Sequence, residues 1–193
     1  MISTIKGKII KKEDMSLLID VAGIGYEVLV PLTVLNALKD IAEGQEVNLV
    51  TFHYYANEPS KSIPVLIGFI NEVEKEFFEK FITVSGVGQK AAVKAISKPI
   101  SEIAKAIDSA DITFLKSLPG IGGQRAKEII AKLQNKVGKF GLIQDGFKLP
   151  AAESKKDIEN EALHVLIQLQ YKRQEALDMI KKALERNSAI TTG

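Results

Sequence analysis

The sequence contains no cysteine and no tryptophan, and only two histidines, His53 and His164. The absence of cysteine excludes disulfide bonds, thiolate zinc sites and cysteine nucleophiles, and two histidines argue against a histidine-rich metal site. No apolar run approaches the ~18 residues that span a bilayer, and no secretory signal pattern follows Met1. We therefore expect a cytoplasmic protein with no membrane segment, no bound metal and no cofactor of its own.

A large charge of one sign is also lacking, since 26 Lys and Arg stand against 24 Asp and Glu. The basic residues nevertheless concentrate in the middle of the chain. Residues 86–139 contain ten Lys or Arg and four acidic residues. Such a local excess is typical of a surface that binds polyanions, or of an ordinary solvated helical face.

The 193 residues are 46% apolar, which is typical of a globular protein, and the chain changes character three times. Strand-like runs occupy residues 2–10, 17–21, 26–30, 47–55 and 65–69, with turn signals between them and one short helix at 32–38 after Pro31. Five short strands and one helix predict an OB-fold β-barrel, with a β-sandwich as the alternative. We place this barrel domain at residues 1–64.

The second part, residues 65–137, is predicted to be an all-α domain. Asn71 and Glu74 form a plausible capping box at its start. Helical periodicity predicts short helices at 72–82, 89–97, 101–109, 112–117 and 123–135. Aromatic residues between Val73 and Phe81 predict either a subunit interface or core packing.

Glycines, Pro150 and polar residues without a sustained period predict a flexible linker at 138–156. Two amphipathic helices after Asp157 predict a small helical domain at 157–193. The predicted fold class is therefore multidomain α+β: an OB-fold barrel, a central helical domain, and a small helical domain on a tether.

An internal repeat with an offset of 34 residues lies in the central domain. Gly86-Val87-Gly88 matches Gly120-Ile121-Gly122, and each copy lies between two predicted short helices. Two glycines around one aliphatic residue allow a tight turn with close backbone approach, while the aliphatic side chain fills the core. This pattern predicts a tandem helix-hairpin-helix domain.

Such hairpins bind phosphate, because exposed glycine amides lie beside the positive end of the following helix. The predicted phosphate-binding residues come from both hairpins and the helices after them: Gly86, Val87, Gly88, Lys90, Gly120, Ile121, Gly122, Gly123, Gln124, Arg125 and Lys127. Phosphate contacts position a protein without reading bases, so the sequence predicts structure-selective DNA binding.

No residue is predicted to be catalytic or to ligate a metal. The phosphate-binding pattern Gly-x-x-x-x-Gly-Lys-Ser/Thr is missing. A hairpin-containing glycosylase or nuclease needs an acid or lysine in a pocket beyond the hairpin, and Glu128 and Asp145 have no evident partner. A general binder of single strands or RNA remains an alternative, although Tyr54 and Tyr55 would face opposite sides of a strand.

The order of these parts resembles the RuvA family, the Holliday-junction-binding subunits of the bacterial branch-migration complex. The resemblance rests on the Gly-Ile-Gly-Tyr-Glu-Val segment at 23–28, Ile-Gly-Phe at 67–69, both hairpins, the tether and the helical end. It implies a homotetramer, with one or two tetramers on each four-way junction, acting in DNA recombination, repair and the SOS response. It also implies a partner, the hexameric RuvB ATPase, which uses ATP and Mg²⁺.

The resemblance further implies an acidic pin on a barrel loop, for which Glu58 matches one position while Pro59 replaces the second acid. The two lysines usual after the second hairpin are here Gly123 and Gln124. The carboxyl domain would dock on RuvB. The residues implied for this contact are Leu163, Leu166, Ile167, Tyr171, Leu177 and Ile180.

Overall fold

A computed structural model of the chain describes residues 1–58 and 61–141, together with the single residue Met179. The chain divides into two units, Met1–Phe147 and Lys148–Gly193, and the fold described below belongs to the first. The predicted RuvB-docking residues and most of the predicted tether lie outside the described residues. None of the described helices is long and apolar enough to cross a membrane.

The amino-terminal half of this unit is a closed five-stranded barrel with the strand order β1-β2-β3-β5-β4. All neighbouring strands are antiparallel except β3 and β5, which are parallel, and β1 closes the barrel by pairing with β4. The strands are β1 (Thr4–Lys12), β2 (Ser16–Val21), β3 (Ile24–Leu29), β4 (Glu46–Glu58) and β5 (Lys61–Phe69), and α1 (Leu32–Ala37) lies between β3 and β4. This topology confirms the predicted OB-type barrel and rules out the sandwich.

The barrel forms because its strands alternate between apolar and polar residues. In β1, for example, Ile5 and Ile9 are buried, whereas the lysines next to them point outward. The predicted domain boundary at residue 64 is wrong, because β5 continues to Phe69. The Cα partner of Phe69 is Val50 of β4, so residues 65–69 complete the barrel wall.

Six helices follow the barrel in the described residues. They are α2 (Glu72–Phe81), α3 (Gln89–Ala95), α4 (Ile100–Asp108), α5 (Ile112–Lys116), α6 (Gly123–Leu133) and α7 (Gly138–Gly141). The amide of Glu74 donates to the Asn71 side chain at 2.9 Å, and the Glu74 carboxylate accepts from the Ile70 amide at 3.0 Å. The predicted pairing of Asn71 with Glu74 is therefore confirmed, with the return hydrogen bond coming from Ile70, the residue before the N-cap.

Helix α2 connects the barrel to the other helices, since it contacts β4 and β5 on one side and α3 and α6 on the other. Its residues Phe77, Phe78 and Phe81 are fully buried. Phe78 packs against Phe52 and Phe69 of the barrel, with ring centroids 5.3 and 5.1 Å apart. The aromatic segment is thus core rather than an interface, and it joins Ile67 and Phe69 of β5 to the helices in one shared hydrophobic core.

The predicted linker begins too early, because residues 138–141 form α7. Phe140 of α7 is fully buried, and its ring packs edge-on against Phe77 at 5.3 Å. The glycines at both ends of α7 suggested a tether, but burial of one aromatic side chain fixes the segment. The central domain therefore extends at least to Gly141.

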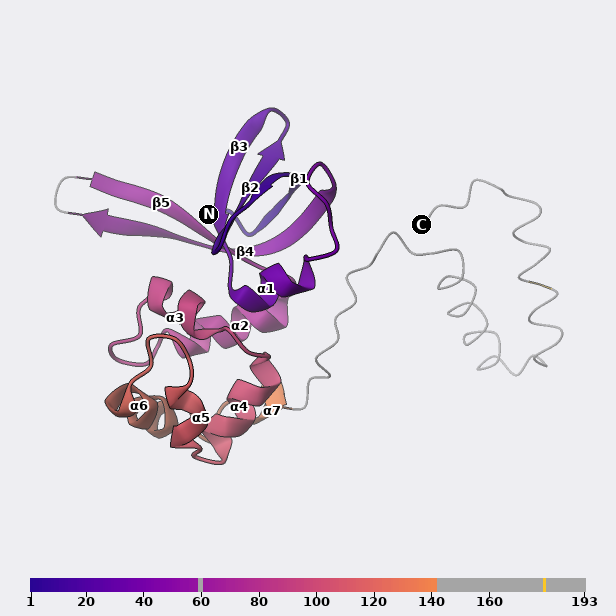
Figure 1. Cartoon of the computed structure of the whole chain (residues 1–193). Helices are drawn as coiled ribbons and strands as arrows, with labels where there is room; N and C mark the ends of the chain where they lie inside the picture. Colours follow the sequence, from indigo (N-terminus) through magenta and orange to yellow (C-terminus); the bar gives the residue numbers. More distant parts are fainter. Residues whose placement is uncertain (59–60, 142–178, 180–193) are drawn as a thin grey trace. The chain divides into compact units, whose positions relative to one another are not determined.

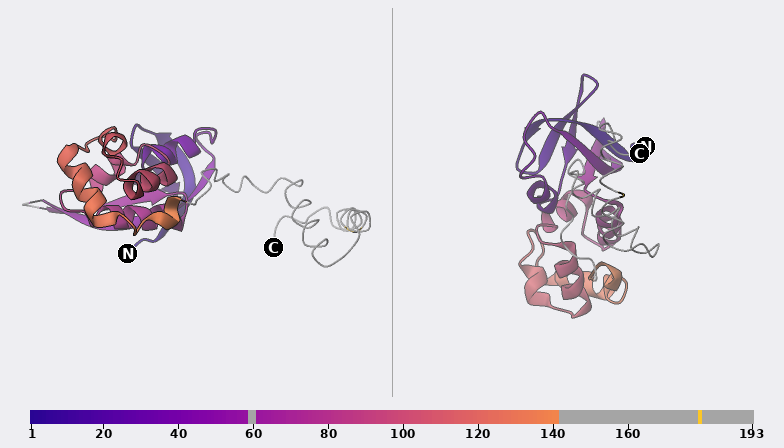
Figure 2. Two further views of the ribbon diagram at one scale, coloured as in Figure 1. Left: turned by 90° about the horizontal axis from the view of Figure 1, so that it is seen from below. Right: turned by 90° about the vertical axis from the view of Figure 1, so that its right-hand side faces the viewer.

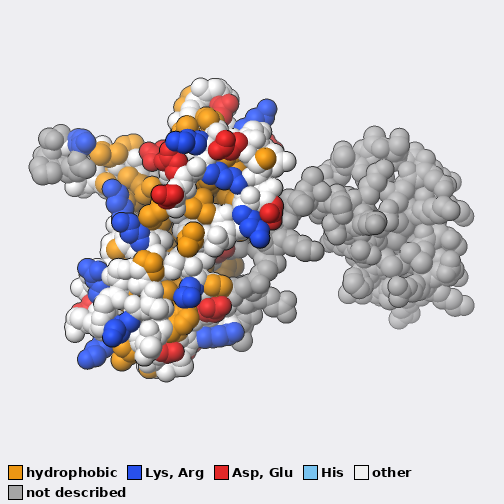
Figure 3. Space-filling model, viewed as in Figure 1, with side chains coloured by type: hydrophobic (Ala, Val, Ile, Leu, Met, Phe, Trp, Pro, Cys, Tyr) orange, Lys and Arg blue, Asp and Glu red, His pale blue; other side chains and the backbone are white. Residues whose placement is uncertain are grey.

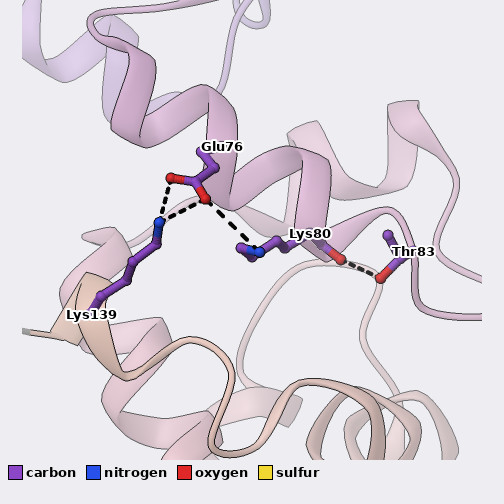
Figure 4. Close-up of polar contacts among 4 residues, drawn as sticks. All are labelled: Glu76, Lys80, Thr83 and Lys139. Atoms are coloured by element: carbon purple, nitrogen blue, oxygen red, sulfur yellow. Dashed lines mark hydrogen bonds and ion pairs between the residues drawn. The ribbon is translucent and has the colours of Figure 1, made fainter.

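An ion-pair cluster also holds α7 to α2 (Figure 4). Lys139 Nζ lies 2.7 and 2.6 Å from the two carboxylate oxygens of Glu76, and Lys80 Nζ lies 3.9 Å from the same carboxylate. The hydrogen bond from Lys139, with the positive charges of Lys139 and Lys80, lowers the pKa of Glu76 from its ordinary value of 4.5. The ion pair between Glu76 and Lys139 is therefore present above the ordinary Glu pKa of 4.5, and it is lost as the pH falls through the lowered pKa of Glu76.

We expect the substitution Glu76→Gln to loosen α7 without unfolding the unit, because exposed ion pairs contribute little to global stability. The measurement is hydrogen exchange of the Phe140 amide, which donates to Val137 O at 2.9 Å. Exchange at this amide should be faster in the variant at pH 7, and the difference should shrink as the pH falls through the lowered pKa of Glu76. Equal exchange in both proteins at pH 7 would show that Phe140 burial alone holds α7.

Candidate nucleic-acid interface

The two predicted hairpins have the same backbone geometry. In the first, the Val87 amide donates to Val84 O at 3.1 Å; in the second, the Ile121 amide donates to Leu118 O at 3.1 Å. The carbonyl oxygens of Gly88 and Gly122 then accept the first helical hydrogen bonds of α3 and α6, both at 2.9 Å. The predicted repeat is therefore a repeat in structure, with an offset of 34 residues.

The two glycines of each hairpin have different roles. Gly86 and Gly120 both have φ +76°, a left-handed conformation that side chains other than glycine rarely adopt. Gly88 and Gly122 have φ −79° and −89° and are the N-caps of α3 and α6. A Cβ atom on either N-cap glycine would have no neighbour within 4 Å. The fold thus requires the first glycine of each pair, and leaves open space at the second.

The geometry of Val87 and Ile121 does not support the direct phosphate contact that the sequence predicts for them. Their side chains are 3% and 5% exposed and belong to the hydrophobic core. Their amides are already used inside the hairpins, as described above. Both residues therefore support the hairpins by packing their side chains into the core.

The amides of Gly86, Gly88, Gly120 and Gly122 are available to a ligand. All four residues are exposed, and within residues 61–141 none of these amides donates a hydrogen bond. The amides of Gly88 and Gly122 lie at the positive ends of α3 and α6. Two equivalent sets of free amides are the arrangement that accepts two phosphates of one nucleic-acid backbone.

The predicted cationic contacts differ between the two hairpins. Lys90 on α3 and Lys127 on α6 are exposed, and basic side chains stand out along the edge of the helical domain where α3 and α6 lie (Figures 1 and 3). Arg125, in contrast, is already engaged, because its Nη1 donates to Gly120 O at 2.7 Å. Gly123 begins α6 and is half-buried.

Glu128 has a hydrogen-bond partner, although it is not the catalytic partner that a glycosylase or nuclease would need. The Gln124 side-chain amide donates to Glu128 Oε1 at 3.0 Å. Spacing of four residues on one helix was the signal that could have revealed this contact. Since Gln124 is engaged with Glu128, its role as a phosphate contact is not evident from this geometry.

A long two-stranded arm projects from the barrel on the side where α3 and α6 lie (Figures 1 and 2). It consists of the outer halves of β4 and β5, where Tyr55 pairs with Pro64 and Glu58 pairs with Lys61. Glu58, the predicted pin residue, therefore lies at the end of β4, next to the tip of the arm. Tyr55 is 60% exposed and is the one aromatic among the strongly exposed large side chains of the described residues.

Tyr54 and His53, both in β4, make structural contacts. Burial raises the pKa of Tyr54, whose ring lies 6.0 Å from that of Phe52. His53 lies within β4, and its Nδ1 accepts a hydrogen bond from the Ile2 amide at 3.2 Å. In the described part of the chain, no three His, Asp or Glu side chains are grouped as metal ligands.

The fold and the site together define a class: proteins in which an OB-type barrel is joined to a tandem helix-hairpin-helix domain with free hairpin amides. Comparison with known proteins agrees with both halves. Residues 1–60 match the family model of the RuvA N-terminal domain, and residues 78–135 match that of the SAM-like helix-hairpin-helix tandem.

Whole-chain relatives give the particular family. A protein from Desulfatibacillum aliphaticivorans is 39% identical and one from Desulfosudis oleivorans is 36% identical; each match covers 100% of this chain and 93% of the relative. A protein from Syntrophus aciditrophicus is 36% identical over 95% of this chain and 89% of its own length. All three are named Holliday junction branch migration complex subunit RuvA. The chain belongs to the RuvA family.

Proposed function

We propose that this chain binds four-way DNA junctions in a structure-specific, sequence-independent way, as the non-motor subunit of a branch-migration complex. The observation that carries the proposal is the pair of equivalent hairpins with exposed, unpaired amides at Gly86, Gly88, Gly120 and Gly122. Amides bind phosphate oxygens whatever the base, so this chemistry selects DNA by backbone shape. The names of the relatives support the choice of a four-way junction as the shape.

We propose that four copies assemble around one junction, because one subunit offers one pair of hairpins and a four-way junction has four arms. Closed symmetric assemblies are the usual form of soluble oligomers. Each subunit would hold the backbone of one arm through its hairpins, and the barrel arms with Glu58 would lie toward the centre.

The motor in this proposal is a separate protein, the hexameric RuvB ATPase, and the work is done in the cytoplasm. The sequence lacks a nucleotide-binding pattern, so ATP and Mg²⁺ would be used by RuvB, and this chain would bind no cofactor. The proposed docking residues are the apolar side chains of the carboxyl segment named above, which lie outside the described residues.

A competition gel shift tests the proposal. The full chain is mixed with a labelled four-way junction, and linear duplex or single strand of matched length is added as competitor, with and without Mg²⁺. We expect a clear preference for the junction, and a plot of log affinity against log salt with a steep negative slope, about −0.9 for each phosphate contacted. Equal affinity for duplex would contradict junction selectivity, and a preference for single strands would favour the general OB-fold binder.

A further inference from the structure

Arg125 lies between the two hairpins. Its Nη1 donates to Gly120 O in the second hairpin at 2.7 Å. Its Nε lies 3.9 Å from the position that a Cβ atom on Gly86 would occupy in the first hairpin. One guanidinium group therefore reaches both glycines of positive φ.

The neighbours of Arg125 fill the same space. Glu128 Oε2 lies 4.0 Å from the same Cβ position on Gly86, while Glu128 Oε1 accepts a hydrogen bond from Gln124. Side chains from the first turns of α6 thus form a bracket, Gln124, Arg125 and Glu128, beside Gly86.

The first copy of the repeat has no such bracket. At the offset of 34 residues, Lys90 corresponds to Gln124, Ala91 to Arg125 and Lys94 to Glu128. Ala91 has neither a charge nor a hydrogen-bond donor on its side chain. Of these corresponding positions, only those of the second copy place side chains beside the first glycine of the other hairpin.

The chemistry of the guanidinium suits this place. It is planar, permanently charged and carries five donors in a fixed fork, so one edge can hold a carbonyl while another faces a second group. The Gly120 carbonyl belongs to the hairpin whose Gly122 amide is free for phosphate. When Arg125 holds this carbonyl, it fixes the shape of the hairpin. Its positive charge also offsets the negative partial charge of the carbonyl oxygen, which lies close to the phosphate-binding amides.

We propose that Arg125 is a positioning residue: it holds the second hairpin in its phosphate-binding shape and sets its distance from the first. The two hairpins then meet two phosphates of one DNA arm together. This inference rests on the proposed junction-binding function, and it assigns Arg125 a role other than the direct phosphate contact that the sequence predicts.

The variants Arg125→Lys and Arg125→Met test the inference, with Lys132→Met as the control. Lysine keeps the charge but not the fork, and methionine keeps only the stem. Lys132 is exposed on α6, two turns from Arg125. Its replacement removes the same charge, away from the hairpins.

Two measurements are made on the full-length variants. The first is junction affinity over a range of salt concentrations. We expect Arg125→Lys and Arg125→Met to weaken binding by about threefold to tenfold, the effect of losing one modest hydrogen bond. Arg125→Lys should keep the wild-type salt slope, and Lys132→Met should change affinity by less than about twofold.

The second measurement is amide hydrogen exchange in the free protein. The Ile121 amide, bonded to Leu118 O, should exchange faster in both Arg125 variants. The Val87 amide, bonded to Val84 O in the first hairpin, is the internal reference, and its exchange should change less than that of Ile121.

Wild-type affinity and wild-type Ile121 exchange in Arg125→Lys would overturn the inference, because a phosphate contact needs only the charge. The exchange comparison requires no DNA. If the wild-type protein failed to prefer junctions, the proposed function would fail. Faster Ile121 exchange would still support the positioning role within the hairpin, and unchanged exchange would refute it.

Discussion

Replacing both Gly88 and Gly122 by aspartate is expected to abolish junction binding while leaving the fold at least as stable as before. Both glycines are helix N-caps with extended backbones and open space at the Cβ position. Aspartate is a preferred N-cap, since its carboxylate accepts hydrogen bonds from the first-turn amides. The same carboxylate would occupy the phosphate site and repel phosphate.

Each substitution removes charge-assisted hydrogen bonds worth about 1.5–3 kcal/mol, so each single variant should lose about 10- to 100-fold in affinity. Binding is measured by titration with a labelled junction, and stability by thermal unfolding followed by circular dichroism. The matched control is Thr113→Asp, which adds one negative charge to the exposed first turn of α5, away from the hairpin glycines. It should bind within about threefold of wild type.

A contrasting pair of variants separates the two glycines of each hairpin. Gly86→Ala and Gly120→Ala place a side chain where φ is +76°, at a cost of roughly 1–2 kcal/mol of unfolding free energy.

Unaltered junction affinity in the double aspartate variant would contradict the hairpin mechanism. Loss of its folded structure would contradict the assignment of Gly88 and Gly122 as free N-caps.

Truncating Phe78 to alanine is expected to have the largest effect on stability. Phe78 is fully buried where α2 meets β4 and β5, and its ring packs against Phe52 and Phe69. Removing a buried phenyl ring lowers the unfolding free energy by about 3–5 kcal/mol, because the protein loses the transfer free energy of the ring and also gains a cavity. The cavity would lie at the contact between barrel and helices, so both should unfold at a lower denaturant concentration.

The measurement is chemical denaturation followed by circular dichroism. The control is Val73→Ala, because Val73 lies on the same helix but is 43% exposed. This substitution should change the unfolding free energy by less than about 0.5 kcal/mol. Phe78→Leu refills most of the cavity and should recover most of the loss, which keeps the test informative if the alanine variant does not fold. A loss below about 1 kcal/mol in Phe78→Ala would contradict the shared core.

The hairpins, the capping box and the barrel strands could be predicted from the sequence because their signals are local. Gly-x-Gly between helical periods, Asn71 three residues before Glu74, and alternation in the strands all act over a few residues. The repeat strengthened the hairpin prediction, since two weak patterns at one offset constrain each other.

The errors arose where distant contacts decide the structure. Phe140 is fixed by Phe77, 63 positions earlier, so the local glycines gave the wrong start for the linker. Residues 65–69 belong to the barrel because β4 pairs with them. Arg125 reads as a free cation in the sequence, and its hydrogen bond to Gly120 depends on the shape of the hairpin.

The measurement that tests the central claim most directly is amide hydrogen exchange of the full chain with and without a four-way junction. If the hairpin amides bind phosphate, protection should increase at residues 85–91 and 119–125, and the increase should disappear in the Gly88→Asp, Gly122→Asp double variant. A junction that binds the wild-type protein tightly, yet leaves exchange in both hairpins unchanged, would contradict the account.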